Sequence, residues 1–139
     1  MNDVSKSPSP SRAANITLWI IQGVLAAMFL FSGVSKFLMP VEEMTKGTGF
    51  SGGFIHFIGA AEILGALGLI LPLLLRIKPA LTPVAAVGLF IIMVGAVVTT
   101  VRMGAAPMAV MPAVFAALLL VVAWKRGTWV TRGRAAGAL

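Results

Sequence analysis

The residues best suited to chemistry in this sequence are a few ionisable side chains within or beside apolar segments. Glu62 is the one acidic residue inside any of these segments. A carboxylate at membrane depth costs at least about 2–3 kcal/mol if unpaired, so it must be neutralised, paired or exposed to a polar cavity. Lys36 and Arg102 are at the ends of their segments and His56 is near the start of its segment, so antiparallel helices place all three on the same side of the membrane. These four residues predict a polar site that binds a small anion or a polar head group.

Helical spacing places these residues on faces that also carry small side chains. Two stripes with steps of four and three are Gln22, Ala26, Phe29, Gly33 and Lys36, and Gly88, Ile92, Gly95, Thr99 and Arg102. Small residues let helices approach closely. The predicted helix-packing positions are therefore Gly33, Gly59, Gly65, Gly88 and Gly95. The resulting hypothesis is a buried network of Lys36, Glu62 and Arg102, which His56 could join.

Each of these residues also has a structural interpretation. Lys36 and Arg102 lie close enough to the membrane boundary for their charged ends to reach water. His56 could be an interfacial residue, and Glu62 could serve only to hold helices together. The glycine stripes could be packing grooves with no ligand. The sequence leaves both interpretations open.

The elements that carry these residues are predicted to be membrane-spanning helices. Of 139 residues, 59% are hydrophobic and 11% charged, whereas a soluble domain has about 45–50% and about 25%. Four apolar runs are each long enough to cross a bilayer, and they lack the alternation of barrel strands. The predicted spans are 16–38, 54–75, 79–101 and 106–124, between a disordered tail, 1–15, and a basic tail, 125–139.

The charge distribution predicts the orientation of this all-α integral membrane four-helix bundle. Eight of the eleven basic residues fall on one side: Lys6, Arg12, Arg76, Lys78, Lys125, Arg126, Arg132 and Arg134. The positive-inside rule places that side, with both termini, in the cytoplasm. Trp19, Trp124 and Trp129 cluster there as interfacial anchors. This topology accounts for the net charge of +7 without any nucleic acid.

Several kinds of chemistry are excluded by residues that the chain lacks. It has no cysteine for thiol exchange and one histidine, too few to hold a haem between paired histidines. No nucleotide-binding motif, catalytic constellation or metal-ligand pair occurs either. We therefore predict no intrinsic cofactor, metal site or catalytic residue.

The motifs resemble those of the DoxX-like family of small four-helix membrane proteins. The first helix closes on FSGVSKF and the second carries GAAEILGALGLILPL, so Gly33 with Lys36 and Glu62 with Gly65 match the family pattern. Many relatives have a histidine or another polar group near the end of the third helix, where this chain has Thr99, Thr100 and Arg102. The resemblance implies a bacterial inner-membrane protein, and relatives include membrane subunits of quinone-linked oxidoreductases.

Three functions follow as hypotheses. The first is a membrane subunit of a redox-linked complex, in which Glu62, Lys36 and Arg102 bind a quinone or small anion while a partner supplies electrons. The second is a structural or assembly subunit that offers helical faces to other membrane proteins or to a second copy. The third is a small proton-coupled transporter that uses Glu62.

Overall fold

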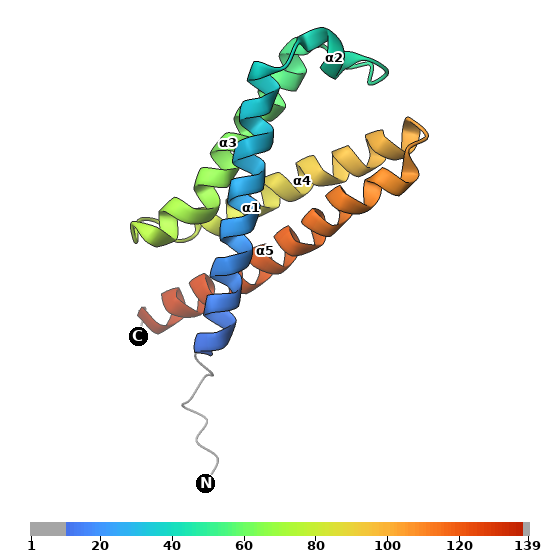
Figure 1. The fold of residues 1–139 in the computed structure, drawn as a ribbon. Helices are drawn as coiled ribbons and strands as arrows, with labels where there is room; N and C mark the ends of the chain where they lie inside the picture. The colour runs from blue at the N-terminus through green and yellow to red at the C-terminus, as the bar shows by residue number, and fades with distance from the viewer. Residues whose placement is uncertain (1–10, 138–139) are drawn as a thin grey trace.

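The computed structural model describes residues 11–137, which form helices joined by short turns and contain no β-strand (Figure 1). The elements are α1 (Arg12–Leu38), α2 (Val41–Thr45), α3 (Gly52–Leu74), α4 (Leu81–Arg102), the short 3-10 helix η1 (Ala106–Ala109) and α5 (Val110–Gly137). Among the described residues, four helical segments are long and apolar enough to cross a membrane. The predicted all-α class and four spans are therefore confirmed.

The two terminal helices are longer than the predicted spans. Helix α1 begins at Arg12 rather than at Ile16, because the Ser11 hydroxyl accepts a hydrogen bond from the Ala14 N–H at 3.1 Å and caps the first turn. Helix α5 continues to Gly137 instead of ending at Trp124. No proline interrupts residues 125–137, so the helix can continue past the apolar run. The predicted tails are thus largely helical where they are described; residues 1–10 and 138–139 lie outside the described part.

The helices pack as two antiparallel hairpins. Helix α1 packs mainly on α3, α4 packs mainly on α5, and the contact between α3 and α4 joins the two pairs. The start of α1, the end of α5 and the turn between α3 and α4 lie at one end, which we call the terminal end. Helix α2 and the turn between α4 and η1 lie at the other, the α2 end, where Figure 1 shows the two hairpins diverging.

The core is a column of apolar side chains where the four long helices meet. Its fully buried members include Leu25, Leu69, Leu89, Leu119 and Val122. Most other large apolar side chains face outward, as expected for helices surrounded by lipid rather than water. Few polar side chains are buried inside the bundle: Gln22, Glu62, Thr82 and Arg126. All of these except Thr82 belong to two polar sites.

Candidate functional site

Glu62 lies on the inward face of α3, and its side chain is 3% exposed. The buried residues of α3 recur at steps of four and three: Ile55, Gly59, Glu62, Ala66 and Leu69. This period is that of one helix face, so the carboxylate is held in the same row as core residues. The position agrees with the predicted inward face of the second span.

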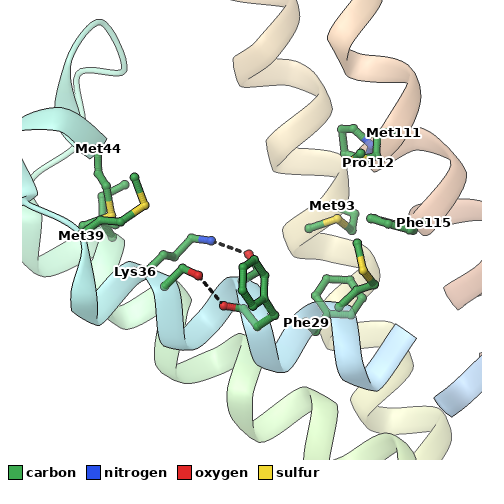
Figure 2. Close-up of a pocket in the computed structure, with 13 residues that line it drawn as sticks. Phe29, Lys36, Met39, Met44, Met93, Met111, Pro112 and Phe115 are labelled. Carbon is green, nitrogen blue, oxygen red and sulfur yellow. Dashed lines mark hydrogen bonds between the residues drawn. The ribbon is translucent and has the colours of Figure 1, made fainter. Parts of the chain in front are cut away.

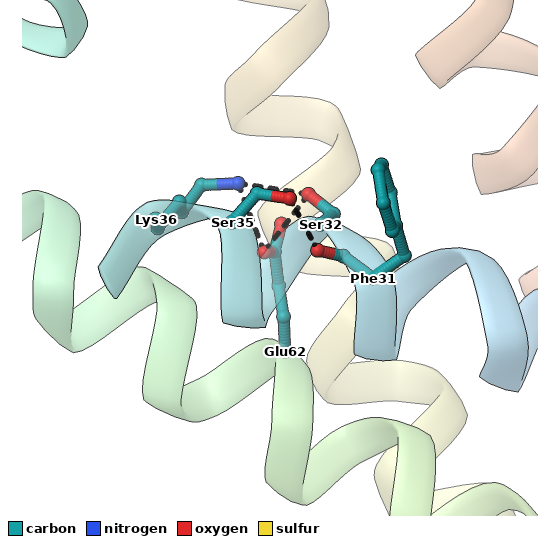
Figure 3. Close-up of polar contacts among 5 residues, drawn as sticks. All are labelled: Phe31, Ser32, Ser35, Lys36 and Glu62. Atoms are coloured by element: carbon teal, nitrogen blue, oxygen red, sulfur yellow. Dashed lines mark hydrogen bonds and ion pairs between the residues drawn. The ribbon is translucent and has the colours of Figure 1, made fainter. Parts of the chain in front are cut away.

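The partner of Glu62 is Lys36 on α1. The Lys36 Nζ donates to Glu62 Oε2 at 2.9 Å and to the Ser32 hydroxyl at 2.9 Å, and Ser32 donates to the same carboxylate oxygen at 3.2 Å (Figure 3). Ser32 and Lys36 are one helical turn apart, so they reach the carboxylate from the same face of α1. Two donors on one oxygen hold an ionised carboxylate inside the bundle.

A glycine contact brings the two helices close enough for this ion pair. A Cβ on Gly33 would lie 2.7 Å from the Gly59 carbonyl oxygen, and a Cβ on Gly59 would lie 3.1 Å from the Lys36 Cβ. No side chain larger than glycine fits at Gly33 without a backbone shift. The glycines therefore set the separation between α1 and α3 at the level of the ion pair.

A cavity of about 630 Å³ opens beside the ion pair, between the diverging hairpins. Its walls are mainly apolar, and Figure 2 shows the Lys36 amine between Met39 and Met44 on one side and Met93 and Phe115 on the other. Ser32 and Ser35 also line it, but the Ser35 hydroxyl donates to the Phe31 carbonyl at 2.7 Å. Lys36, 24% exposed in its side chain, thus belongs to both the ion pair and the cavity wall.

Two of the predicted network members lie apart from the carboxylate. Arg102 is exposed at the end of α4 and makes no hydrogen bond or ion pair with Glu62. His56 stacks on Phe37, with ring centroids 5.1 Å apart, and likewise makes no bond with Glu62. The structure therefore brings Lys36 to Glu62 and adds Ser32, while Arg102 and His56 stay outside this group.

Some of the predicted helix-packing glycines contact another helix, and others do not. Gly65 meets Leu89, whose side-chain atoms would lie 2.6 Å from an added Cβ. Gly88 and Gly95, in contrast, are exposed, and an added Cβ would meet no atom of another helix within 4 Å. Within the described bundle, Gly88 and Gly95 therefore contact no other helix, whereas Ile92 of the same stripe packs against the core. Helix α4 turns inward its face with Thr82, Ala86, Leu89 and Met93.

Sequence reasoning missed a second polar group, at the terminal end. Arg126 on α5 is 6% exposed; its Nε donates to Gln22 Oε1 at 2.7 Å, and its Nη1 donates to Asn15 Oδ1 at 2.9 Å. Gln22 in turn donates to the Leu69 carbonyl. The available signal was Gln22, a polar residue deep in the first span that needs a partner.

The fold and this site define a class: a small multi-pass helical membrane protein with a buried ion pair beside a mainly apolar cavity. A family model described as the DoxX-like family matches residues 20–122. The chain belongs to the DoxX-like family, as its motifs suggested. Neither a curated protein nor a solved structure matches the chain. The matched region contains Lys36 and Glu62 and ends before Arg126.

Proposed function

We propose that this protein is a membrane subunit of a redox-linked complex that binds a quinone in the cavity beside Lys36. The observation that carries the proposal is the position of the Lys36 amine, which is paired with Glu62 and still lines a mainly apolar cavity. A quinone has a flat apolar ring and carbonyl oxygens that accept hydrogen bonds. The apolar walls favour such a ligand over a small anion.

The partner in this proposal supplies the electrons. The chain has no cysteine and one histidine, and no cluster of three potential metal ligands occurs among the described residues. A quinone-binding subunit of this composition would work beside a subunit that carries a redox centre. Other membrane-protein subunits or a second copy of this chain would contact its outward faces.

The quinone proposal is tested by extracting the protein in mild detergent and measuring quinone per mole of protein by mass spectrometry. Lys36→Met removes the charged donor and should lower retention about tenfold, the effect of one hydrogen bond to a charged group. Lys46→Met is the matched control, since Lys46 is exposed at the same end of the bundle and does not line the cavity. Wild-type protein without quinone, or equal retention in both variants, would contradict the proposal.

A second pair of variants tests the cavity rather than the charge. Met111 lines the cavity and Met108 does not, although both are exposed and three residues apart. Met111→Trp should obstruct the cavity and lower retention, whereas Met108→Trp should leave it unchanged. If a flavoprotein or another redox subunit co-purifies with wild type, its loss on Glu62→Gln would support the complex.

We also propose that the protein lies in a bacterial inner membrane with both termini in the cytoplasm. Most described basic residues lie in the elements that form the terminal end: the start of α1 (Arg12), the turn between α3 and α4 (Arg76, Lys78) and the second half of α5 (Lys125, Arg126, Arg132, Arg134). The positive-inside rule favours that end as cytoplasmic. Because the chain has no cysteine, Lys46→Cys and Arg134→Cys give single labelling sites. An impermeant maleimide should label only the Lys46→Cys protein in intact cells; the reverse pattern would refute this orientation.

A further inference from the structure

The buried guanidinium of Arg126 lies outside the site of the proposed function, and its surroundings do not neutralise it. Its two hydrogen-bond partners, Gln22 and Asn15, are neutral amides. It also lies over two indole rings, 5.5 Å from the Trp19 centroid and 5.1 Å from the Trp129 centroid. These contacts orient the side chain and leave its full positive charge inside the bundle.

No carboxylate of residues 11–137 is available to balance this charge. Glu42 and Glu43 are on α2, at the opposite end, and Glu62 pairs with Lys36. One guanidinium nitrogen of Arg126, Nη2, is buried and has no hydrogen-bond partner. A buried, unpartnered donor on an uncompensated cation is unfavourable unless an anion completes it.

A second cavity, of about 380 Å³, adjoins this group. Arg126, Trp129 and Arg134 line it from α5, spaced so that one face of the helix presents all three. Leu73, Pro79 and Val130 provide apolar walls. The cavity therefore combines two cationic side chains with an apolar surface. Such a site suits a ligand that has both an anionic group and an apolar part.

We propose that this cavity binds the phosphate of an anionic phospholipid, with Arg126 and Arg134 as the phosphate ligands. Trp19 and Trp129 lie beside Arg126, and indole rings in membrane proteins prefer the depth of the lipid head groups. Basic pockets between helices at this depth suit anionic head groups. The apolar walls favour a lipid over a free phosphate ion, because the lipid also covers Leu73 and Val130.

The test is lipid binding to full-length protein that has been delipidated in detergent. Phosphatidylglycerol, phosphatidylcholine or inorganic phosphate is added, and bound molecules are counted by native mass spectrometry. Wild type should bind phosphatidylglycerol in preference to phosphatidylcholine. Arg126→Gln should weaken that binding about tenfold or more, and Arg134→Gln about fivefold.

Arg102→Gln is the matched control, because Arg102 is an exposed arginine at the α2 end and its substitution removes the same charge. Should Arg126→Gln fail to fold, Arg134→Gln still decides, because Arg134 is exposed. Equal phosphatidylglycerol binding by Arg134→Gln and Arg102→Gln would overturn the proposal. So would equal affinity of wild type for the two lipids. Displacement of the lipid by millimolar inorganic phosphate would refute the lipid and identify a soluble anion as the ligand.

Discussion

The two ends of the bundle bury charge in different ways. At the α2 end, Lys36 and Glu62 neutralise each other beside the larger cavity. At the terminal end, Arg126 is held by two amides and two indole rings, and the described residues provide no opposite charge. Hydrogen bonds alone thus orient a buried cation, but only an anion balances it. The difference suggests that the first group is complete within the chain and the second is completed by a ligand.

The comparison has an energetic consequence that mutations can test. Removing one partner of a compensated pair creates an unbalanced buried charge. Removing the side chain of Arg126, which has no opposite charge beside it, eliminates an unbalanced charge. It leaves only neutral groups without hydrogen-bond partners. Similar truncations at the two ends should therefore differ in cost.

The largest effect is expected for Lys36→Met, which leaves the Glu62 carboxylate, 3% exposed, without its cation. The free energy of unfolding in mixed micelles should fall by about 3 kcal/mol. The double variant Lys36→Met/Glu62→Leu should regain more than half of that loss, because it leaves no charge behind. Equal stability of the single and double variants would mean that Glu62 is not ionised in the bundle.

A slightly smaller effect is expected for Gly33→Ala, at the glycine contact that sets the ion pair. The added Cβ would lie 2.7 Å from the Gly59 carbonyl oxygen, so α1 and α3 must separate. Unfolding free energy should fall by about 2 kcal/mol. In a double-mutant cycle the coupling of Lys36 to Glu62 should also weaken. An unchanged coupling energy would show that the ion pair does not depend on this close approach.

Arg126→Met should cost less, about 1 kcal/mol of unfolding free energy in lipid-free micelles. The lost hydrogen bonds to Gln22 and Asn15 are partly offset by removal of the unbalanced cation. Unfolding in mixed micelles measures the free-energy change of Arg126→Met under the same conditions as that of Lys36→Met. A loss as large as that of Lys36→Met would contradict the contrast between the two ends.

The smallest effect, of opposite sign, is expected for Gly88→Ala. Gly88 is exposed within α4 and an added Cβ would meet no atom of another helix within 4 Å. Alanine lowers the entropy of the unfolded chain, so unfolding free energy should rise by about 0.5–1 kcal/mol. Comparison of Gly88→Ala with Gly33→Ala distinguishes a glycine that allows close helix contact from one that does not. A destabilised Gly88→Ala protein would indicate that another molecule packs on this face.

The fold was largely predictable because apolar length alone identifies helices that cross a bilayer. The contact of Lys36 with Glu62 was also accessible, since a buried carboxylate needs a cation and few were at the right depth. The inward face of α4 was not predictable, because the residues of α4 are apolar on nearly every side and Gly88 resembled a packing position. Which side turns inward depends on the fit of Leu89 against α3.

The Arg126 group was hidden for a related reason. Its position next to Lys125 and after a long apolar run is typical of a cytoplasmic flanking charge. It becomes buried because α5 continues as a helix and returns Arg126 to Gln22, 104 residues earlier in the chain. Contacts between such distant segments depend on how the hairpins pack, which hydropathy does not encode.

The cavity between the hairpins has a consequence for how a ligand would be supplied. Two of its lining residues are mostly exposed on the flank of the bundle, Phe31 at 73% and Met111 at 62%. A quinone bound there, as proposed, would therefore enter sideways, by diffusion within the bilayer, without crossing water. Its occupancy would follow the mole fraction of ligand among the lipids. Adding lipid at a fixed amount of ligand would empty the site, whereas changing the volume of water would not.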